Sequence, residues 1–305
     1  MILLCVDTIA DNGLIDRHYL KEQGIEVYFL STQPSKHGKD GDEIIVEQIT
    51  YANLVQLAKR VKANKIISFS EYLFATVAKG SSLLNLSAMI DEQAYLFSDK
   101  YQMTQKIQPS EYVIPTLLVN KKMSYADLSQ QLGAAKLCLK PRAAAGSLYV
   151  TFIKKQSEIE DFYNKDYYQD QKFIVQPAIE GELYHVEMVI QNGTVLLNNP
   201  RKYSRPNCEM VINNQAIFST SLADQSLLTR LAKAAATVRE RLQLNNGIMH
   251  TEFFVEHQSN KIYFLETNLR PPGIGLNYLY QHLLGISLET LLCLIACNKP
   301  VPKLS

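Results

Sequence analysis

The chain has 305 residues, of which 31 are Lys or Arg and 30 are Asp or Glu, so its formal net charge is +1. At about 150 residues per domain, this length predicts roughly two domains with a substantial core. A net charge so close to zero provides no global field that would attract nucleic acid or an anionic membrane. We therefore expect any phosphate binding to be local, and we expect neither a nucleic acid nor a membrane as a partner.

The N-terminal segment and the cysteines indicate a cytoplasmic protein. The segment MILLCVD lacks the basic region of a signal peptide, and no apolar run reaches the about 18 residues that a membrane span needs. The five cysteines are scattered and lie mostly in apolar stretches, which is typical of reduced core residues. Cys293 and Cys297 are one helical turn apart, but no histidine or second cysteine pair lies nearby to complete a zinc site.

Short β-rich runs alternate with helical patterns over the first 90 or so residues. Strands are expected at 1–6, 25–30, 43–49 and 65–70, with helices ending near Gly24 and covering 51–61. This alternation predicts βαβ units and a parallel sheet. The first strand is followed by DTIADNG, which lacks the GxGxxG turn that holds a dinucleotide pyrophosphate, so a Rossmann-type NAD enzyme is disfavoured.

The rest of the chain mixes helices with strands that are joined by short turns. A helical stretch is expected from about Asp91 to Gln108, where Pro109 ends it, and the longest helix is expected over 222–244. The turns QNG and HQSN are each flanked by two β-rich runs, which predicts two hairpins. The other expected strands are 112–119, 135–140, 148–155 and 173–179, and the other expected helices are 124–132, 156–164 and a C-terminal helical region.

The second of these hairpins contains two carboxylates that the strand register brings together. In an antiparallel pair, residues directly opposite each other share a face, so a three-residue loop at 258–260 places Glu252 opposite Glu266. Asn268 lies two residues further on the same face, and Arg270 follows if the extended conformation persists. Two carboxylates this close repel unless a cation lies between them, and oxygen-only ligands suit Mg²⁺. The alternative, a pair of solvated hairpin residues, is disfavoured because apolar side chains occupy both faces of the strand pair.

Two further segments have features of a nucleotide site. KLCLKPRAAAGSLYV places Lys140 at the end of an apolar strand and before a loop of small residues, which lets backbone N–H groups approach phosphate oxygens. No Walker A pattern occurs, and a strand-end lysine before a turn is by itself a common feature of loops. In VQPAIEGELYHVEMVI, backbone groups of the Gly-containing connection could hold an adenine, whereas His185 alone is more typical of a half-buried strand histidine.

In order and approximate spacing, these segments resemble the ATP-grasp superfamily over nearly the whole chain. The most specific part is Glu252 followed by Glu266, Asn268 and Arg270 at alternate positions, and YHVEMV is similar to the ribose-side strand of the biotin carboxylase branch. The resemblance implies a chain of α/β and α+β class. It would have an N-terminal parallel α/β domain over 1–95 and a two-lobed ATP-grasp fold with antiparallel sheets. The small lobe, 96–175, would carry the phosphate-binding loop, and the large lobe, 176–305, would carry the metal site.

The resemblance also implies roles for individual residues. Lys100 and Lys140 would bind the phosphates of ATP, and Lys140 and Arg270 would act on the transferred phosphoryl group. Two Mg²⁺ ions would be held, with Mn²⁺ as a substitute, by Glu252, Glu266 and Asn268. The implied loop and hinge residues of the nucleotide site are Ala145, Gly146, Ser147, Gln176, Pro177, Ala178 and Ile179, with His185 near the ribose.

Departures from the family pattern narrow the expected function. The phosphate loop reads RAAAG where glycines are usual, and Gln176 or Pro177 stands where a glutamate is often found. After Arg270 the chain reads PPGIG, which differs from the stretch that a biotin carboxylase needs and resembles the substrate-side loop of ligases that join amino acids or peptides. We therefore expect an ATP- and Mg²⁺-dependent carboxylate–amine ligase. The alternatives are another ATP-grasp phosphoryl transferase or carboxylase-like enzyme, and a nucleotide-binding protein without turnover.

Contacts with the small-molecule carboxylate and amine are expected in three places. NPRKYSRP supplies Arg201, Lys202 and Arg205, which could hold a substrate carboxylate or form a solvated basic loop. Glu71 follows a predicted parallel strand, where it could bind a substrate amine or lie at the start of a helix. The substrate-side loop adds Gly273. The C-terminal helical region could pack internally or against a second copy, so a homodimer stays an open alternative.

Overall fold

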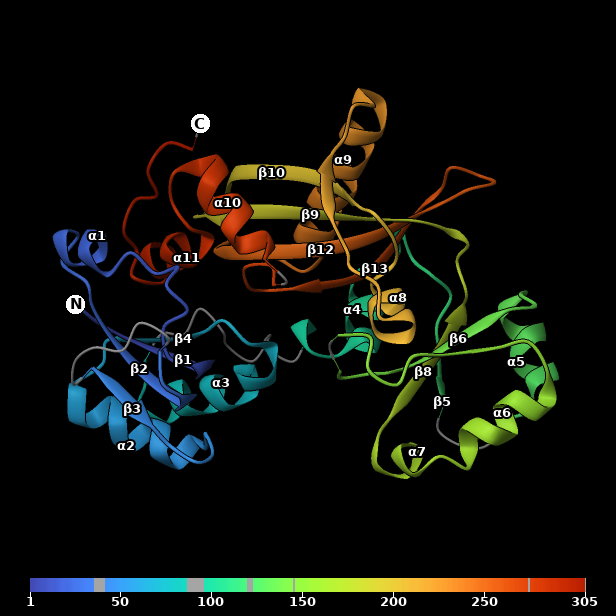
Figure 1. The fold of residues 1–305 in the computed structure, drawn as a ribbon, viewed down its shortest axis with the longest axis horizontal. Coiled ribbons are helices and arrows are strands. Elements are labelled where there is room, and N and C mark those ends of the chain that lie inside the picture. The colour runs from blue at the N-terminus through green and yellow to red at the C-terminus, as the bar shows by residue number, and fades with distance from the viewer. Residues whose placement is uncertain (36–41, 87–95, 120–122, 145, 274, 305) are drawn as a thin grey trace.

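A computed structural model describes residues 1–35, 42–86, 96–119, 123–144, 146–273 and 275–304. Within these residues the strands form three sheets, one parallel and two antiparallel, which follow one another along the chain (Figure 1). The expected mixed class, with a parallel α/β part followed by two antiparallel sheets, is confirmed.

The N-terminal sheet is parallel and has the strand order β3-β2-β1-β4. The first half of its strand β1, Leu3–Val6, is fully buried, which agrees with the apolar run MILLCV, whereas the end of the strand is partly exposed. The helix over 51–61 begins where the Thr50 side chain accepts from the backbone N–H of Asn53 while the Asn53 side chain accepts from that of Thr50. The elements are β1 (Ile2–Ile9), α1 (Arg17–Glu22), β2 (Glu26–Gln33), β3 (Glu43–Ile45), α2 (Tyr51–Val61), β4 (Lys65–Ser68), a short 3₁₀ helix (Glu71–Leu73) and α3 (Phe74–Leu83).

The second sheet is antiparallel, with the order β5-β8-β6-β7, and forms a small lobe at the right of Figure 1. Its core includes an edge-to-face contact between Phe162 and Phe173, whose ring centroids are 4.9 Å apart. The helix over 125–132 ends at Gly133, whose φ of +63° is the left-handed conformation that glycine adopts without strain. The elements are α4 (Lys100–Lys106), β5 (Leu117–Val119), α5 (Tyr125–Leu132), β6 (Leu137–Pro141), β7 (Thr151–Ile153), α6 (Gln156–Tyr163), α7 (Asp166–Asp170) and β8 (Phe173–Pro177).

The third sheet is antiparallel, has five strands in the order β11-β10-β9-β12-β13 and carries most of the predicted site. The longest of its helices, α9, packs against β9 and β10 and starts after the cap residue Asp224, slightly later than the expected 222. The elements are β9 (Gly181–Gln191), β10 (Thr194–Tyr203), α8 (Asn207–Asn213), β11 (Ser219–Ser221), α9 (Gln225–Arg241), β12 (Gly247–Glu256), β13 (Ile262–Asn268), α10 (Leu276–Leu284) and α11 (Leu288–Ala296).

The register of β12 and β13 places Glu252 directly opposite Glu266, as the sequence predicts. The loop length of the hairpin and the regularity of its register differ from the expectation. The hairpin closes between Glu256 and Lys261, so its loop has four residues, and an irregularity between Glu252 and Phe253 shifts the register by one. The two differences cancel at the carboxylates.

Helix α11 joins the N-terminal sheet to the third sheet. It is buried along its whole length and packs against α1, β4 and β12. Three of the five cysteines, Cys5, Cys293 and Cys297, are free thiols buried here, as expected for core residues, while Cys138 and Cys208 are partly exposed.

Among the described helices none is long and apolar enough to cross a membrane alone, and one bent pair, α10 with α11 at 79°, meets the length and composition criteria only when joined.

Gly181, at the start of β9, allows a close approach between two strands. A Cβ built there would lie 2.3 Å from the backbone oxygen of Val255, so Gly181→Ala should lower the free energy of unfolding by about 1–3 kcal/mol. Gly273→Ala is the control, because a Cβ there meets nothing within 4 Å. Urea denaturation of both variants measures the difference, and equal stabilities would contradict the packing argument.

Candidate functional site

A central cavity of about 520 Å³ is lined by residues of the small lobe, the third sheet and the short helix after β4. Fourteen of the residues singled out in the sequence line it: Glu71, Lys100, Lys140, Gly146, Ser147, Gln176, Pro177, Ala178, Ile179, Glu252, Glu266, Asn268, Arg270 and Gly273. Ala145 lies outside the described residues. The fold therefore gathers, in one hollow, segments that are almost 200 residues apart in the chain.

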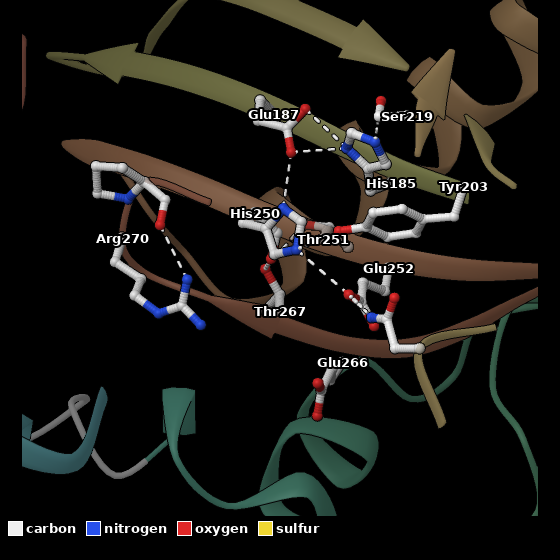
Figure 2. A network of polar contacts seen from close by, with 12 residues as sticks. His185, Glu187, Tyr203, Ser219, His250, Thr251, Glu252, Glu266, Thr267 and Arg270 are labelled. Carbon is white, nitrogen blue, oxygen red and sulfur yellow. Dashed lines mark hydrogen bonds and ion pairs between the residues drawn. The ribbon is translucent and has the colours of Figure 1, made fainter. Parts of the chain in front are cut away.

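The wall formed by the third sheet contains the oxygen donors that the sequence predicts as metal ligands. Glu252 and Glu266 face each other across β12 and β13, and Asn268 follows on the same face of β13. Glu252 is only 5% exposed, and its Oε1 accepts a hydrogen bond from Asn207 Nδ2 at 2.7 Å. Nε2 of His250 lies 3.3 Å from the same oxygen (Figure 2).

Two lysines compensate the charge of these carboxylates from the opposite side. Lys100 Nζ lies 2.8 Å from Glu266 Oε2 and also donates to the carbonyl of Ala144 in the small-residue loop. Burial alone would raise the pKa of the Glu266 carboxyl, but Lys100 and Lys140 lower it below its ordinary value. Lys140 is 5% exposed, and burial lowers the pKa of its ammonium group. Lys140 has no hydrogen-bond or ion-pair partner among the described residues, so its charge is available to an anion in the cavity.

Arg270 and Glu71 form a forked ion pair that joins the third sheet to the N-terminal sheet. Arg270 donates from Nε and Nη2 to the two carboxylate oxygens of Glu71 and from Nη1 to the carbonyl of Pro271. Burial raises the pKa of the Glu71 carboxyl, yet the hydrogen bonds and charge of Arg270 outweigh burial and lower it overall. In this state Glu71 is already paired, so a substrate amine would have to share it with Arg270.

The structure does not bring the basic residues of β10 and its following loop into the cavity. Lys202 points to the opposite face of the sheet, where it pairs with Glu182 and lines a separate hollow. Arg201 donates to Ser219 Oγ, and Arg205 donates to Gln215. Adjacent strand residues alternate between faces, so Arg201 and Lys202 cannot act on one ligand from the same side.

His185 also lies away from the cavity lining and belongs to a buried polar network. Its Nδ1 contacts both oxygens of Glu187, at 2.8 and 3.0 Å, and its Nε2 lies 2.8 Å from Ser219 Oγ. Glu187 also contacts Nδ1 of His250, at 2.7 Å (Figure 2). The hydroxyl of Tyr280 donates to the other oxygen of Glu187. His185 is fully buried, so the expected ribose contact would require that this arrangement change.

The ionisable groups in this network change the pKa values of one another. Burial would raise the pKa of the Glu187 carboxyl, but the charge and hydrogen bonds of His185 and His250 hold it well below its usual range. Burial would lower the pKa of His250, but its hydrogen bonds to Glu187 and Glu252 raise it to about 9. His250 is therefore cationic at neutral pH and lies beside the Glu252 carboxylate.

Three residues of this site were not identified from the sequence. His250 precedes Glu252 by two residues, so strand alternation could have placed it on the same face. Asn207 and Tyr280 reach the site from helices α8 and α10, and nothing in their local sequence indicates these contacts.

The donor set tests whether a divalent cation suits the site. Glu252, Glu266 and Asn268 offer oxygen atoms only, which suits Mg²⁺. The side-chain oxygen Oδ1 of Asn207 is buried and has no hydrogen-bond partner among the described residues. These residues fit a hard cation that also binds phosphate oxygens. His185, Glu187 and His250 also place ligand-type atoms within 4.8 Å of one another, but those atoms already satisfy one another by hydrogen bonds.

Comparison with known proteins gives a family and a fold. A family model described as an ATP-grasp domain matches residues 97–274. No curated protein sequence matches the chain significantly.

Many solved structures are similar to the chain, among them three that match it over nearly its whole length. The L-amino acid ligase from Bacillus licheniformis has a TM-score of 0.70 and 15% identity, covering 97% of this chain and 75% of that one. N5-carboxyaminoimidazole ribonucleotide synthetase from Thermotoga maritima has a TM-score of 0.76 and 15% identity, covering 99% and 77%. The biotin carboxylase domain dimer of the Hydrogenobacter thermophilus 2-oxoglutarate carboxylase, in complex with MgADP, ADP and bicarbonate, has a TM-score of 0.75 and 15% identity, covering 98% and 70%.

The Arg270–Glu71 pair predicts a pH-dependent contribution to stability. Because the pKa of Glu71 is lowered in the folded state, its stabilisation is present above the ordinary carboxyl pKa and is lost as the pH falls through the folded-state pKa. Glu71→Gln leaves the charge of Arg270 without its partner, so it should cost about 3 kcal/mol at pH 7 and less in acid.

Glu180→Gln provides the matched control. Glu180 pairs with Lys136 at 3.5 Å, but the two side chains are 73% and 35% exposed, against 12% and 17% for Glu71 and Arg270. Its loss should change stability by less than about 1 kcal/mol. Urea titrations at pH 7 and pH 4 make the comparison, and a Glu71→Gln cost that is as small as the control, or that grows in acid, would show that the pair is not stabilising.

Proposed function

This chain belongs to the ATP-grasp family, and from that premise we propose that it is an ATP- and Mg²⁺-dependent carboxylate–amine ligase acting on an amino acid or small peptide. The observation that carries the proposal is the facing pair Glu252 and Glu266, with Lys100 and Lys140 opposite and Arg270 beside it. This arrangement suits a ligand with several phosphates and a metal ion, because both signs of charge are supplied in one cavity.

The two walls of the cavity support a division of roles. The hinge of Gln176, Pro177, Ala178 and Ile179 forms an apolar floor with backbone polar groups for an adenine, and Gln176 is held by its bond to Thr116 Oγ1 at 2.8 Å. Gly146 and Ser147 have positive φ values of 65° and 58°, so the small-residue loop turns sharply beside Lys140. We assign the phosphates to the space between this loop and the two glutamates.

The proposed reaction has two steps. A substrate carboxylate oxygen bonds to the γ-phosphorus of ATP while the bond to the β-phosphate oxygen breaks, which gives an acyl phosphate and ADP. An amine nitrogen then bonds to the acyl carbon. The bond between the acyl carbon and the phosphate oxygen breaks, phosphate leaves with the electron pair, and the amine loses a proton. Lys100 and Lys140 neutralise the oxygens that gain charge, and Arg270 orients the group in transfer. Glu252, Glu266 and Asn268 would hold Mg²⁺, which would supply additional charge neutralisation.

Cofactors and partners follow from the same site. We propose ATP as a substrate with two Mg²⁺ ions, for which Mn²⁺ can substitute, and we place the reaction in the cytoplasm. The reaction's partners are a small carboxylic acid and an amine, and the similar L-amino acid ligase supports this choice of substrate class. A homodimer is part of the proposal, since one of the similar structures is a domain dimer.

The second candidate is a nucleotide-binding protein without turnover. The feature that favours it is the loop sequence RAAAG, in which alanines replace the glycines usual in this family. Such a protein would bind the nucleotide at the same site as the ligase but would form no product.

Nucleotide binding predicts a metal-dependent gain in thermal stability. At a hundredfold excess of ligand over its Kd, ATP with Mg²⁺ should stabilise the fold by about 2–3 kcal/mol, and EDTA should remove most of the gain. Differential scanning fluorimetry with ATP, Mg²⁺ or both measures the effect. If the melting temperature does not move with any combination, the nucleotide site itself is wrongly assigned.

Ligase activity predicts ADP release that requires both a carboxylate and an amine. A screen of amino acids and small carboxylic acids, each with and without an amine, should identify a pair that gives ADP, phosphate and an amide. Glu266→Gln should lower the rate by about 100-fold or more, because a metal and phosphate ligand loses its charge. Glu256→Gln, at the other end of the same hairpin, should react normally. Normal turnover by Glu266→Gln would refute the metal assignment, and ADP release without an amide would favour a different phosphoryl transferase.

A further inference from the structure

Glu187 is the most enclosed charged side chain of the third sheet. It lies in the middle of β9, its exposed fraction is 0%, and it does not line the central cavity. Three donors meet its carboxylate: Nδ1 of His185, Nδ1 of His250 and the hydroxyl of Tyr280. Burying a carboxylate costs free energy unless it is paired and hydrogen-bonded, and here one of the partners that satisfies it reaches the proposed metal-binding residues.

That partner is His250, whose two ring nitrogens both face carboxylates. Nδ1 lies 2.7 Å from Glu187 Oε1, and Nε2 lies 3.3 Å from Glu252 Oε1. With acceptors on both sides, each nitrogen donates, so the orientation of the ring is determined at two points. The hydroxyl of Tyr203 lies 3.5 Å from Nε2 (Figure 2).

At Glu252 the donors converge on one oxygen. Both Asn207 Nδ2 and His250 Nε2 approach Oε1, at 2.7 and 3.3 Å, while Oε2 accepts no hydrogen bond from the described residues. A carboxylate held by one oxygen presents the other for a cation, as in metal sites where outer partners orient the ligands.

We propose that Glu187 is a positioning residue that acts through His250 to orient Glu252 for the metal ion. The presence of a metal ion at Glu252 rests on the proposed function. Glu187 and His250 do not themselves bind the ion in this arrangement. Tyr280 donates to Glu187 Oε2, whereas His250 contacts Oε1, and Asn207 completes the support of Glu252. The contacts of Glu187 with His250 and of His250 with Glu252 form a continuous chain from the centre of β9 to the cavity.

The test measures metal binding directly, on the full chain and apart from turnover. Mn²⁺ is titrated into protein with ADP and followed by electron paramagnetic resonance, and ADP affinity in EDTA is measured by calorimetry. Glu187→Gln should weaken Mn²⁺ binding by about 10-fold or more, in the range found for outer partners of metal ligands. Its ADP affinity in EDTA should be unchanged, because Glu187 does not contact the cavity.

Tyr280→Phe is the matched control. It removes another donor to the same buried carboxylate and keeps the ring, but Tyr280 is not between Glu187 and Glu252, so Mn²⁺ affinity should stay within about 2-fold. Equal losses in Tyr280→Phe and Glu187→Gln, or an equal loss of ADP affinity in EDTA, would show that Glu187 is only a structural group.

A pair of variants at His250 keeps the proposal testable if Glu187→Gln does not fold. The amide nitrogen of Asn can replace Nδ1 and that of Gln can replace Nε2, so His250→Gln should retain more Mn²⁺ affinity than His250→Asn. The reverse order would overturn the proposed line of contacts. A wild-type protein that binds no ADP, with or without Mn²⁺, would instead refute the proposed function.

Discussion

The antiparallel pairing of Glu252 with Glu266 is the constraint on which the site depends. Two carboxylates on opposite residues of adjacent strands repel, and burial makes that repulsion harder to screen. The chain compensates with cations from different directions: Lys100 from α4, Lys140 from β6, and His250 from the same strand as Glu252. Because Lys100 already contacts Glu266, a metal ion that binds Glu266 would displace the Lys100 ammonium group from it. The positive charges around the two carboxylates would then be redistributed.

The same need for compensation explains how three separately built sheets form one cavity. The third sheet supplies the acids, the small lobe supplies lysine and a turn of small residues, and the N-terminal part supplies Glu71 as the partner of Arg270. Glu266 and Arg270 each have their ionic partner in a different part of the chain, at Lys100 and Glu71. Charge pairing therefore acts together with the buried helix α11 to hold the parts in register, and the apolar contacts of α11 provide the larger, non-directional share of that stability.

Sequence reasoning succeeded where periodicity alone decides the answer. Alternation along β12 and β13 was enough to place Glu252, Glu266 and Asn268 on one face, even though the loop length and the bulge each differed from expectation. It did not succeed where the outcome depends on which face of a strand meets which layer. Lys202 was grouped with Arg201 because both are basic, yet neighbouring strand residues point in opposite directions. Asn207 and Tyr280 come from helices whose packing is non-local, so no pattern in the chain could have placed them.

The near-neutral charge of the chain now has a structural meaning. At the cavity, charges of opposite sign cancel within a few ångströms, as at Lys100 with Glu266 and Arg270 with Glu71. A polyphosphate ligand with its cations is itself close to balanced, so it can enter without leaving a large uncompensated charge. The desolvation free energy of these buried ions is spent when the protein folds. The charged groups then need little rearrangement when charge moves within the site during the reaction.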